Sequence, residues 1–124
     1  MCSRRCKYVR KQIKNTIHGF CCANYKPCKI TQRKRESIIS NQIGRSGTSI
    51  GANIREAQYT HGKADFIAKL QIALKEASET GYWLELLYRT NYINKAEYQS
   101  LDSPCTSIRV MLIASVNTAK ETLQ

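Results

Sequence analysis

The chain of 124 residues is long enough for one domain with a single core and too short for two. It has no apolar run approaching the ~18 residues of a membrane span, and no apolar stretch follows its basic N-terminus. We therefore expect no membrane association and no secretory signal, and hence a cytoplasmic protein. Without secretion, the six cysteines do not predict a disulfide framework.

Positive charge and cysteine are concentrated near the N-terminus. Residues 1–35 contain 11 Lys or Arg and no acidic residue, whereas residues 36–124 contain nine of each, so the formal net charge of +11 belongs to the first 35 residues. Five of the six cysteines lie within the first 28 residues. We therefore divide the chain into a basic, Cys-rich segment, 1–32, and a helical domain, 33–124. A basic segment of this kind is typical of proteins that bind nucleic acid or another anionic surface.

The first predicted helix of the domain begins near Arg33 and ends between Tyr59 and Gly62, where the string THGK breaks the pattern. Its small and apolar positions recur every three or four residues on one face: Ile39, Ile43, Gly47, Ile50, Ile54 and Ala57. Each glycine costs an isolated helix about 1 kcal/mol relative to alanine, so this face needs close packing within the chain or between subunits. We assign four residues to that packing: Gly44, Gly47, Gly51 and Ile54.

The strongest predicted helix runs from Ala64 to about Asn91. Its apolar stripe is formed mainly by six residues: Phe66, Leu70, Ala73, Ala77, Leu84 and Leu87. Two ion pairs at i, i+4 are expected within this helix: Asp65 with Lys69, and Lys75 with Glu79. Gly81 interrupts the helix, and a close contact with a neighbour would explain it.

Asn94 and Glu97 form a predicted capping box that opens another helix. Pro104 should either end a short helix or kink a long one. Beyond it the helical stripe continues to the C-terminus: Cys105, Ile108, Leu112, Val116, Ala119 and Leu123. No β-hairpin signal or useful period-two alternation occurs. The predicted class is all-α, with short loops between antiparallel helices.

Two strings of this sequence carry a resemblance to a known family. They are GRSGTSIGANIREAQ at 44–58 and ADFIAKLQIALKEASETGYWLELL at 64–87. They resemble the four-helix bundle proteins also called 23S rRNA intervening-sequence proteins, and the likeness extends over about residues 33–124. The resemblance implies an antiparallel up-down four-helix bundle that assembles into a ring-shaped homo-oligomer, often a pentamer. It implies no enzymatic activity and no cofactor.

The same resemblance implies that nucleic acid is a partner. Some members of the family are encoded inside insertions in ribosomal RNA genes. A related accessory protein of diversity-generating retroelements binds nucleic acid and a reverse transcriptase through a basic surface. RNA, DNA and a protein such as a reverse transcriptase are therefore the expected partners.

The N-terminal segment departs from the family's amphipathic first helix. Residues 8–17 give a weak stripe, and HGFCCANYKPC then breaks the helical period. Reading the codons of residues 21–32 one nucleotide later permits an apolar string that looks like the family's first helix. We hypothesise that residues 1 to about 31 are a frameshift product, so that the first helix is atypical or degraded. The alternative is a native segment that binds phosphates through its basic run.

Four basic residues of the domain are candidates for a nucleic-acid-binding surface: Lys34, Arg35, Arg45 and Arg55. The last two lie ten residues apart, on roughly one side of a helix, and a ring would repeat them as a basic belt. The alternative is that these side chains are solvated or pair with Glu36 and Glu56.

Other functional readings of the sequence are weaker. Tyr82 and Trp83 could stack on bases, although packing in the core or at a subunit interface is favoured. No Asp/His motif accompanies the serines and threonine at 46–49, so we expect no hydrolase. Cys2 and Cys6 have the spacing of a structural zinc pair, but Cys22 and Cys28 are too widely spaced for the second pair, so we expect no metal.

Two function hypotheses of different classes remain. One is an oligomeric, non-enzymatic accessory protein that binds nucleic acid by charge and shape. The other is a structural or protein-interaction module with no nucleic-acid role, and a third possibility is a non-functional frameshifted copy.

Overall fold

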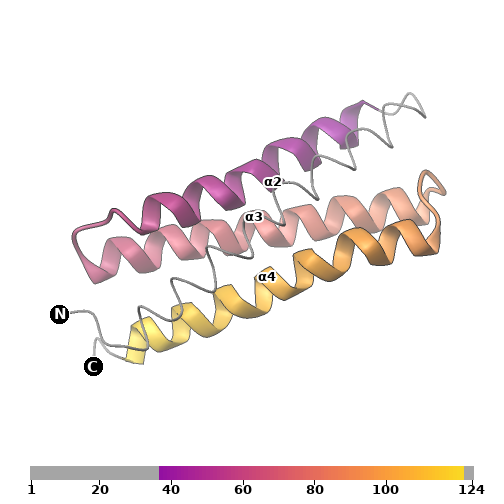
Figure 1. The fold of residues 1–124 in the computed structure, drawn as a ribbon. Helices are drawn as coiled ribbons and strands as arrows, with labels where there is room; N and C mark the ends of the chain where they lie inside the picture. The colour runs from indigo at the N-terminus through magenta and orange to yellow at the C-terminus, as the bar shows by residue number, and fades with distance from the viewer. Residues whose placement is uncertain (1–36, 122–124) are drawn as a thin grey trace.

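The computed structural model describes residues 37–121, which form three α-helices and no strand (Figure 1). They are α2 (Ile38–Ala57), α3 (Lys63–Arg89) and α4 (Lys95–Glu121). The all-α prediction is confirmed for this part of the chain. The first helix of the predicted four-helix bundle lies outside the described residues, as does the frameshift hypothesis.

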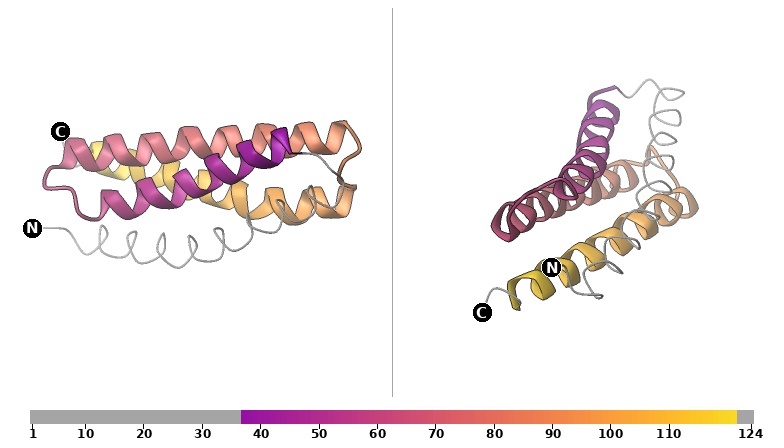
Figure 2. Two further views of the ribbon diagram at one scale, coloured as in Figure 1. Left: turned by 90° about the horizontal axis from the view of Figure 1, so that it is seen from above. Right: turned by 60° about the vertical axis from the view of Figure 1, so that its left-hand side comes forward.

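The central element of the described fold is α3. It packs against both α2 and α4, whereas no Cα atom of α2 lies within 8 Å of one in α4. The chain reverses direction at each connection, so neighbouring helices are antiparallel (Figure 2). No described helix is apolar over a stretch long enough to cross a bilayer.

The turn between α2 and α3 is short and hydrogen-bonded. The backbone N–H groups of Gln58 and Tyr59 donate to the carbonyls of Arg55 and Glu56 at 3.1 and 2.9 Å. These bonds continue the helical path for two residues beyond Ala57. The predicted helix end between residues 59 and 62 is therefore close to the observed one.

The predicted capping box opens α4. The backbone N–H of Asn94 donates to Glu97 Oε2 at 2.8 Å, and the N–H of Glu97 donates to Asn94 Oδ1 at 2.8 Å. These reciprocal bonds satisfy two donors that a helix start leaves without intrahelical acceptors. Asn91, with a φ of 62°, reverses the chain just before the cap.

Pro104 lies inside α4 and does not end it. The alternative of a short helix ending at this proline is therefore wrong. Its neighbours Leu101, Cys105 and Ile108 are all buried, so the same face packs inward on both sides of the proline. Burial of this stripe offsets the hydrogen bond that a proline removes from the helix.

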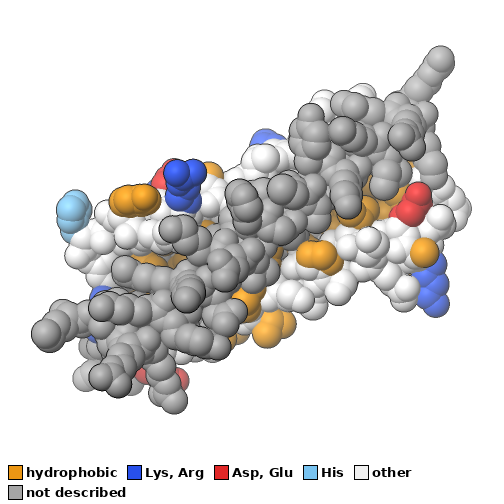
Figure 3. All heavy atoms as spheres, viewed as in Figure 1, with side chains coloured by type: hydrophobic (Ala, Val, Ile, Leu, Met, Phe, Trp, Pro, Cys, Tyr) orange, Lys and Arg blue, Asp and Glu red, His pale blue; other side chains and the backbone are white. Residues whose placement is uncertain are grey.

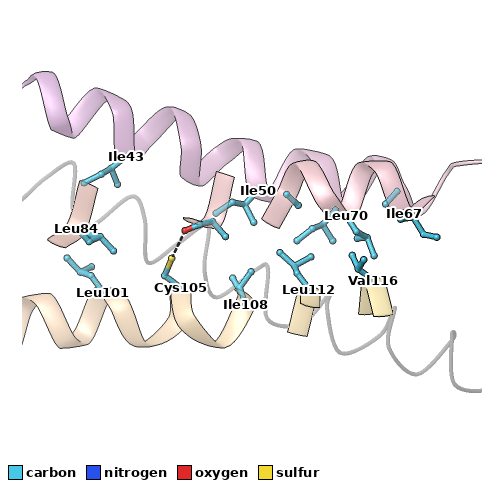
Figure 4. Close-up of a cluster of buried hydrophobic side chains, with 14 of the residues drawn as sticks. Ile43, Ile50, Ile67, Leu70, Leu84, Leu101, Cys105, Ile108, Leu112 and Val116 are labelled. Atoms are coloured by element: carbon cyan, nitrogen blue, oxygen red, sulfur yellow. Dashed lines mark hydrogen bonds between the residues drawn. The ribbon is translucent and has the colours of Figure 1, made fainter. Parts of the chain in front are cut away.

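The core lies where apolar residues of the three helices meet (Figure 4). Its largest fully buried apolar side chains come from every described helix: Ile43, Ile50, Ile54, Leu70, Leu84, Leu87, Ile108 and Leu112. The Cys105 thiol donates to the carbonyl of Ala77 at 3.3 Å, which fixes α4 on α3 near the middle of the core.

Candidate nucleic-acid interface

Arg45 is exposed on α2, but its charge is paired. Its Nη2 atom lies 2.5 Å from Oε1 of Glu79 on α3, and its Nε donates to Gln42 Oε1 at 3.2 Å. The sequence analysis offered Glu36 and Glu56 as alternative partners for the arginines. The observed partner of Arg45 is instead Glu79 on the neighbouring helix. Arg45 therefore contributes less positive potential to the surface than an unpaired arginine.

Arg55 is exposed near the end of α2 and has no ion pair within residues 37–121. Ten residues separate it from Arg45, which places the two side chains about 80° apart around the helix. Lys34 and Arg35 lie outside the described residues. Of the four predicted binding residues, Arg55 is the one that lies within residues 37–121 and forms no ion pair there.

Ion pairs across the edge of the α2–α3 interface replace those expected within α3. Lys69 Nζ lies 2.6 Å from Glu56 Oε2, and the hydrogen bond and charge of Glu56 raise the pKa of Lys69. Asp65, the expected partner, makes a smaller contribution in the same direction. Glu79 likewise pairs with α2 and not with Lys75. Lys69 and Glu79 therefore pair with residues of α2 and not with the residues one turn away on α3.

Hydroxyl groups of α2 have structural roles. Ser46 and Thr80 are fully buried, and their hydroxyl oxygens lie 2.8 Å apart across the α2–α3 interface. Thr80 also reaches the carbonyl of Glu76 at 2.9 Å, and Thr48 donates to the carbonyl of Gly44 at 2.7 Å. None of these hydroxyls lies in a described arrangement with a histidine that could activate it.

The glycine stripe of α2 does not face α3. Gly47, Gly51 and Ile54 are buried, and Gly44 is half-buried. At about 100° per residue, the three glycines lie roughly 100–160° around the helix from Ser46, which contacts α3. What packs on this stripe is not described, so its role in helix packing stays a prediction.

Gly81 lies beside a side chain of α4. A Cβ atom at this position would lie 3.4 Å from Nη1 of Arg109 on α4. At this distance a methyl group would make an ordinary van der Waals contact, so the contact does not by itself require glycine.

Tyr82 is 56% exposed and does not belong to the core, contrary to the core packing favoured from its position in the stripe. Its ring lies edge-on to Trp83, with centroids 4.9 Å apart. Trp83 is half-buried, and its Nε1 donates to Glu79 Oε1 at 3.2 Å. The pair is anchored beside an acidic side chain, which disfavours a phosphate backbone there. Subunit-interface packing stays a prediction.

A surface that the sequence analysis missed lies at the α2–α3 turn. Tyr59 is 75% exposed there, and His61 and Lys63 are exposed beside it. Figure 3 shows histidine, apolar and basic side chains at this end of the molecule. We used Tyr59 only to mark a helix end; the signal that would have found the surface is an aromatic residue among basic ones in a turn.

Among residues 37–121, no three His, Cys, Asp or Glu side chains come together in an arrangement that could hold a metal ion. Cys2, Cys6, Cys22 and Cys28, considered above for zinc, lie outside the described residues.

A family model described as 23S rRNA-intervening sequence protein matches residues 10–114. The chain belongs to this family. The match begins well before residue 33, where the resemblance in the sequence became recognisable. The hypothesis that residues 1 to about 31 are a frameshift product stays a prediction.

A solved structure extends the family likeness over most of the chain. It is the crystal structure, at 1.70 Å resolution, of a protein of unknown function from the S23 ribosomal protein family of Bacteroides thetaiotaomicron. The two chains are 45% identical, with a TM-score of 0.84, and the alignment covers 88% of this chain and 98% of the other. Among curated proteins, none matches the chain.

Proposed function

We propose that this member of the 23S rRNA-intervening sequence protein family is a non-enzymatic homo-oligomer that binds RNA or DNA through basic side chains. The observation that carries the proposal is the segregation of charge. The described residues 37–121 contain nine Lys or Arg and eight Asp or Glu, whereas residues 1–35 contain 11 basic residues and no acid. A near-neutral helical body joined to so basic a segment is well suited to contacts with phosphates.

Family membership supports this function and adds an expectation about assembly. The names of the family and of the Bacteroides relative refer to ribosomal RNA and to ribosomal proteins. A ring, and a pentamer in particular, would repeat each basic residue around one axis, so weak contacts would add through multivalency. A reverse transcriptase is the protein partner that we propose on the resemblance to retroelement accessory proteins.

A salt titration of binding tests the proposal. The full chain, with its oligomeric state measured by light scattering, is titrated against labelled RNA and DNA at 50–300 mM salt. We expect the logarithm of the binding constant to fall linearly with the logarithm of salt concentration. The double variant Arg45→Glu, Arg55→Glu should bind more weakly. Binding that this variant leaves unchanged would overturn a role for the α2 surface, and absence of any binding would overturn the function.

A protein-interaction module is the second candidate, and a specific observation favours it. Val110 and Ile113 on α4 are 61% and 47% exposed, one turn apart. Exposed aliphatic side chains on neighbouring positions of a helix are typical of contact surfaces for proteins. Oligomer formation without binding to nucleic acid at low salt would favour this second function.

A further inference from the structure

One end of the described molecule presents an aromatic ring among basic side chains. Tyr59 is 75% exposed in the turn between α2 and α3. Arg55 lies one helical turn earlier, and His61 and Lys63 follow within four residues; all three are exposed. We call Arg55, Tyr59, His61 and Lys63 the Tyr59 cluster.

Hydrogen bonds of the turn hold the backbone at Tyr59 in place relative to α2. The N–H of Tyr59 donates to the carbonyl of Glu56 at 2.9 Å, and the hydroxyl of Thr60 donates to the carbonyl of Ala57 at 2.8 Å. The turn therefore extends the helix and is anchored to it. The backbone that carries Tyr59 is therefore already ordered and loses little conformational freedom when a ligand binds, which favours binding.

The charge around Tyr59 is positive on balance. Arg55 has no ion pair within residues 37–121. The nearest acid along α2, Glu56, is paired with Lys69 at 2.6 Å. Asp65 in the first turn of α3 is the remaining nearby acid in the sequence. A phosphate backbone that passes Tyr59 would therefore meet more cationic than anionic side chains.

The other exposed tyrosines of the described chain lack this setting. Tyr82 is 56% exposed on α3, where Glu79 and Glu85 lie within one turn of it. Tyr92 is 36% exposed at the opposite end of α3, and the nearby Arg89 is paired with Glu85 at 2.7 Å. Exposure of an aromatic ring alone therefore does not single out Tyr59; the unpaired arginine beside it does.

We propose that the Tyr59 cluster is a contact site for single-stranded nucleic acid, in which Tyr59 stacks on a base and the basic side chains bind the adjacent phosphates. This proposal rests on the proposed function, and it adds that the nucleic acid bound at this site is single-stranded. Aromatic rings stack on any base, and cations beside them follow the backbone, so the site requires no particular sequence. Bases inside a duplex are already stacked on each other, so a duplex cannot use the ring.

Binding of the full chain to a labelled 12-nucleotide oligouridylate, with a 12-base-pair RNA duplex as comparison, tests the site. Tyr59→Ala should weaken single-strand binding by about 5- to 100-fold and leave duplex binding within about 2-fold, because it removes one stacking contact. Tyr59→Phe keeps the ring and should retain affinity. Arg55→Gln should reduce the slope of the salt dependence by about one phosphate contact.

Tyr82→Ala is the matched control, since it removes an exposed tyrosine flanked by acids. It should leave both affinities unchanged. Wild-type affinity of Tyr59→Ala would overturn the site and leave the proposed function standing. A Tyr59→Leu variant that binds like wild type would show that only apolar area matters, as in docking to a protein, and would also overturn it. A wild-type chain that binds neither probe at low salt would overturn the function and the site together.

Discussion

The two neighbours of α3 are held by different kinds of contact. On the α2 side, the buried hydroxyls of Ser46 and Thr80 meet at 2.8 Å and ion pairs join the helices at the edge. On the α4 side, Tyr88 and Tyr98 stack with centroids 4.9 Å apart, and no ion pair joins the two helices within residues 37–121.

The two interfaces therefore differ in how strictly they determine the alignment of the helices and in what stabilises their packing. Sliding α2 along α3 by one turn would separate the two buried hydroxyls, and the hydrogen bond between them contributes about 0.5–1.5 kcal/mol. The polar contacts therefore select one alignment of α2. On the α4 side one buried hydrogen bond, from the Cys105 thiol to the carbonyl of Ala77, accompanies apolar burial. Apolar burial is not directional, so it is less selective for alignment.

The largest expected effect comes from truncating the apolar α4 side. Leu112 on α4 is 1% exposed, and Leu112→Ala should lower the free energy of unfolding by about 2–5 kcal/mol through lost burial and a cavity. Urea unfolding followed by circular dichroism measures the loss. Gln99→Ala, at an exposed site on the same helix, is the control and should change stability by no more than about 0.5 kcal/mol. A loss at Leu112 as small as the control's would contradict apolar burial as the main contribution.

The next effect is a fall in stability at alkaline pH that arises on the α4 side. Burial, aided by the negative charge of Asp102, raises the pKa of the Cys105 thiol from 9.0 to about 11. Between these values the unfolded chain has lost a proton that the folded chain retains. Stability is therefore full below pH 9 and falls as pH rises toward 11, by up to about 3 kcal/mol.

Other groups also titrate in that range, so the measurement is a difference between two proteins. Wild type and Cys105→Ala are unfolded in urea from pH 8 to 11, and the wild type should show the steeper decline. Parallel curves would show that the thiol does not titrate differently in the folded and unfolded chains.

The α2 side should respond more weakly and with a characteristic pattern. Thr80→Val removes one hydroxyl of the buried pair and should cost about 0.5–1.5 kcal/mol, because Ser46 loses its partner across the interface and keeps only the carbonyl of Ile43 at 3.5 Å. The double variant Ser46→Ala, Thr80→Val should cost less than the sum of the two single variants. Additive losses in a double-mutant cycle of urea unfolding would show that the two hydroxyls do not interact.

The sequence predicted the helices well because their burial is periodic. Ile43, Ile50 and Ile54 recur at helical spacing, and all three are buried. The capping box at Asn94 was also predictable, since both of its bonds are local in sequence. Periodic and local signals need no knowledge of which helix lies beside which.

The ion pairs and the exposed aromatic residues could not be predicted in the same way. Within α3 alone, Lys69 and Glu79 have partners one turn away, and the better partners become visible only when α2 is placed alongside. Tyr82 continues an apolar stretch in sequence, yet it projects outward because its neighbours Gly81 and Leu84 occupy the buried face of α3. The exposure of Tyr59 could be recognised only in the structure, where no described residue covers its ring.

The smallest expected change in stability, and the one that links the α2 side to function, is Glu79→Gln. The Arg45–Glu79 pair is largely exposed, and pairs of that kind contribute about 0.2–1 kcal/mol, so thermal unfolding should shift only slightly. The neutral amide retains an acceptor for Trp83 and releases the charge of Arg45. Affinity for nucleic acid should therefore rise, with a steeper dependence on salt.

Glu85→Gln removes an equal charge beside Arg89 and not beside Arg45, so it is the matched control. A gain in affinity confined to Glu79→Gln places Arg45 in the binding surface, whereas equal gains reflect net charge alone. No gain in either variant would place the bound nucleic acid away from this edge of the α2–α3 interface.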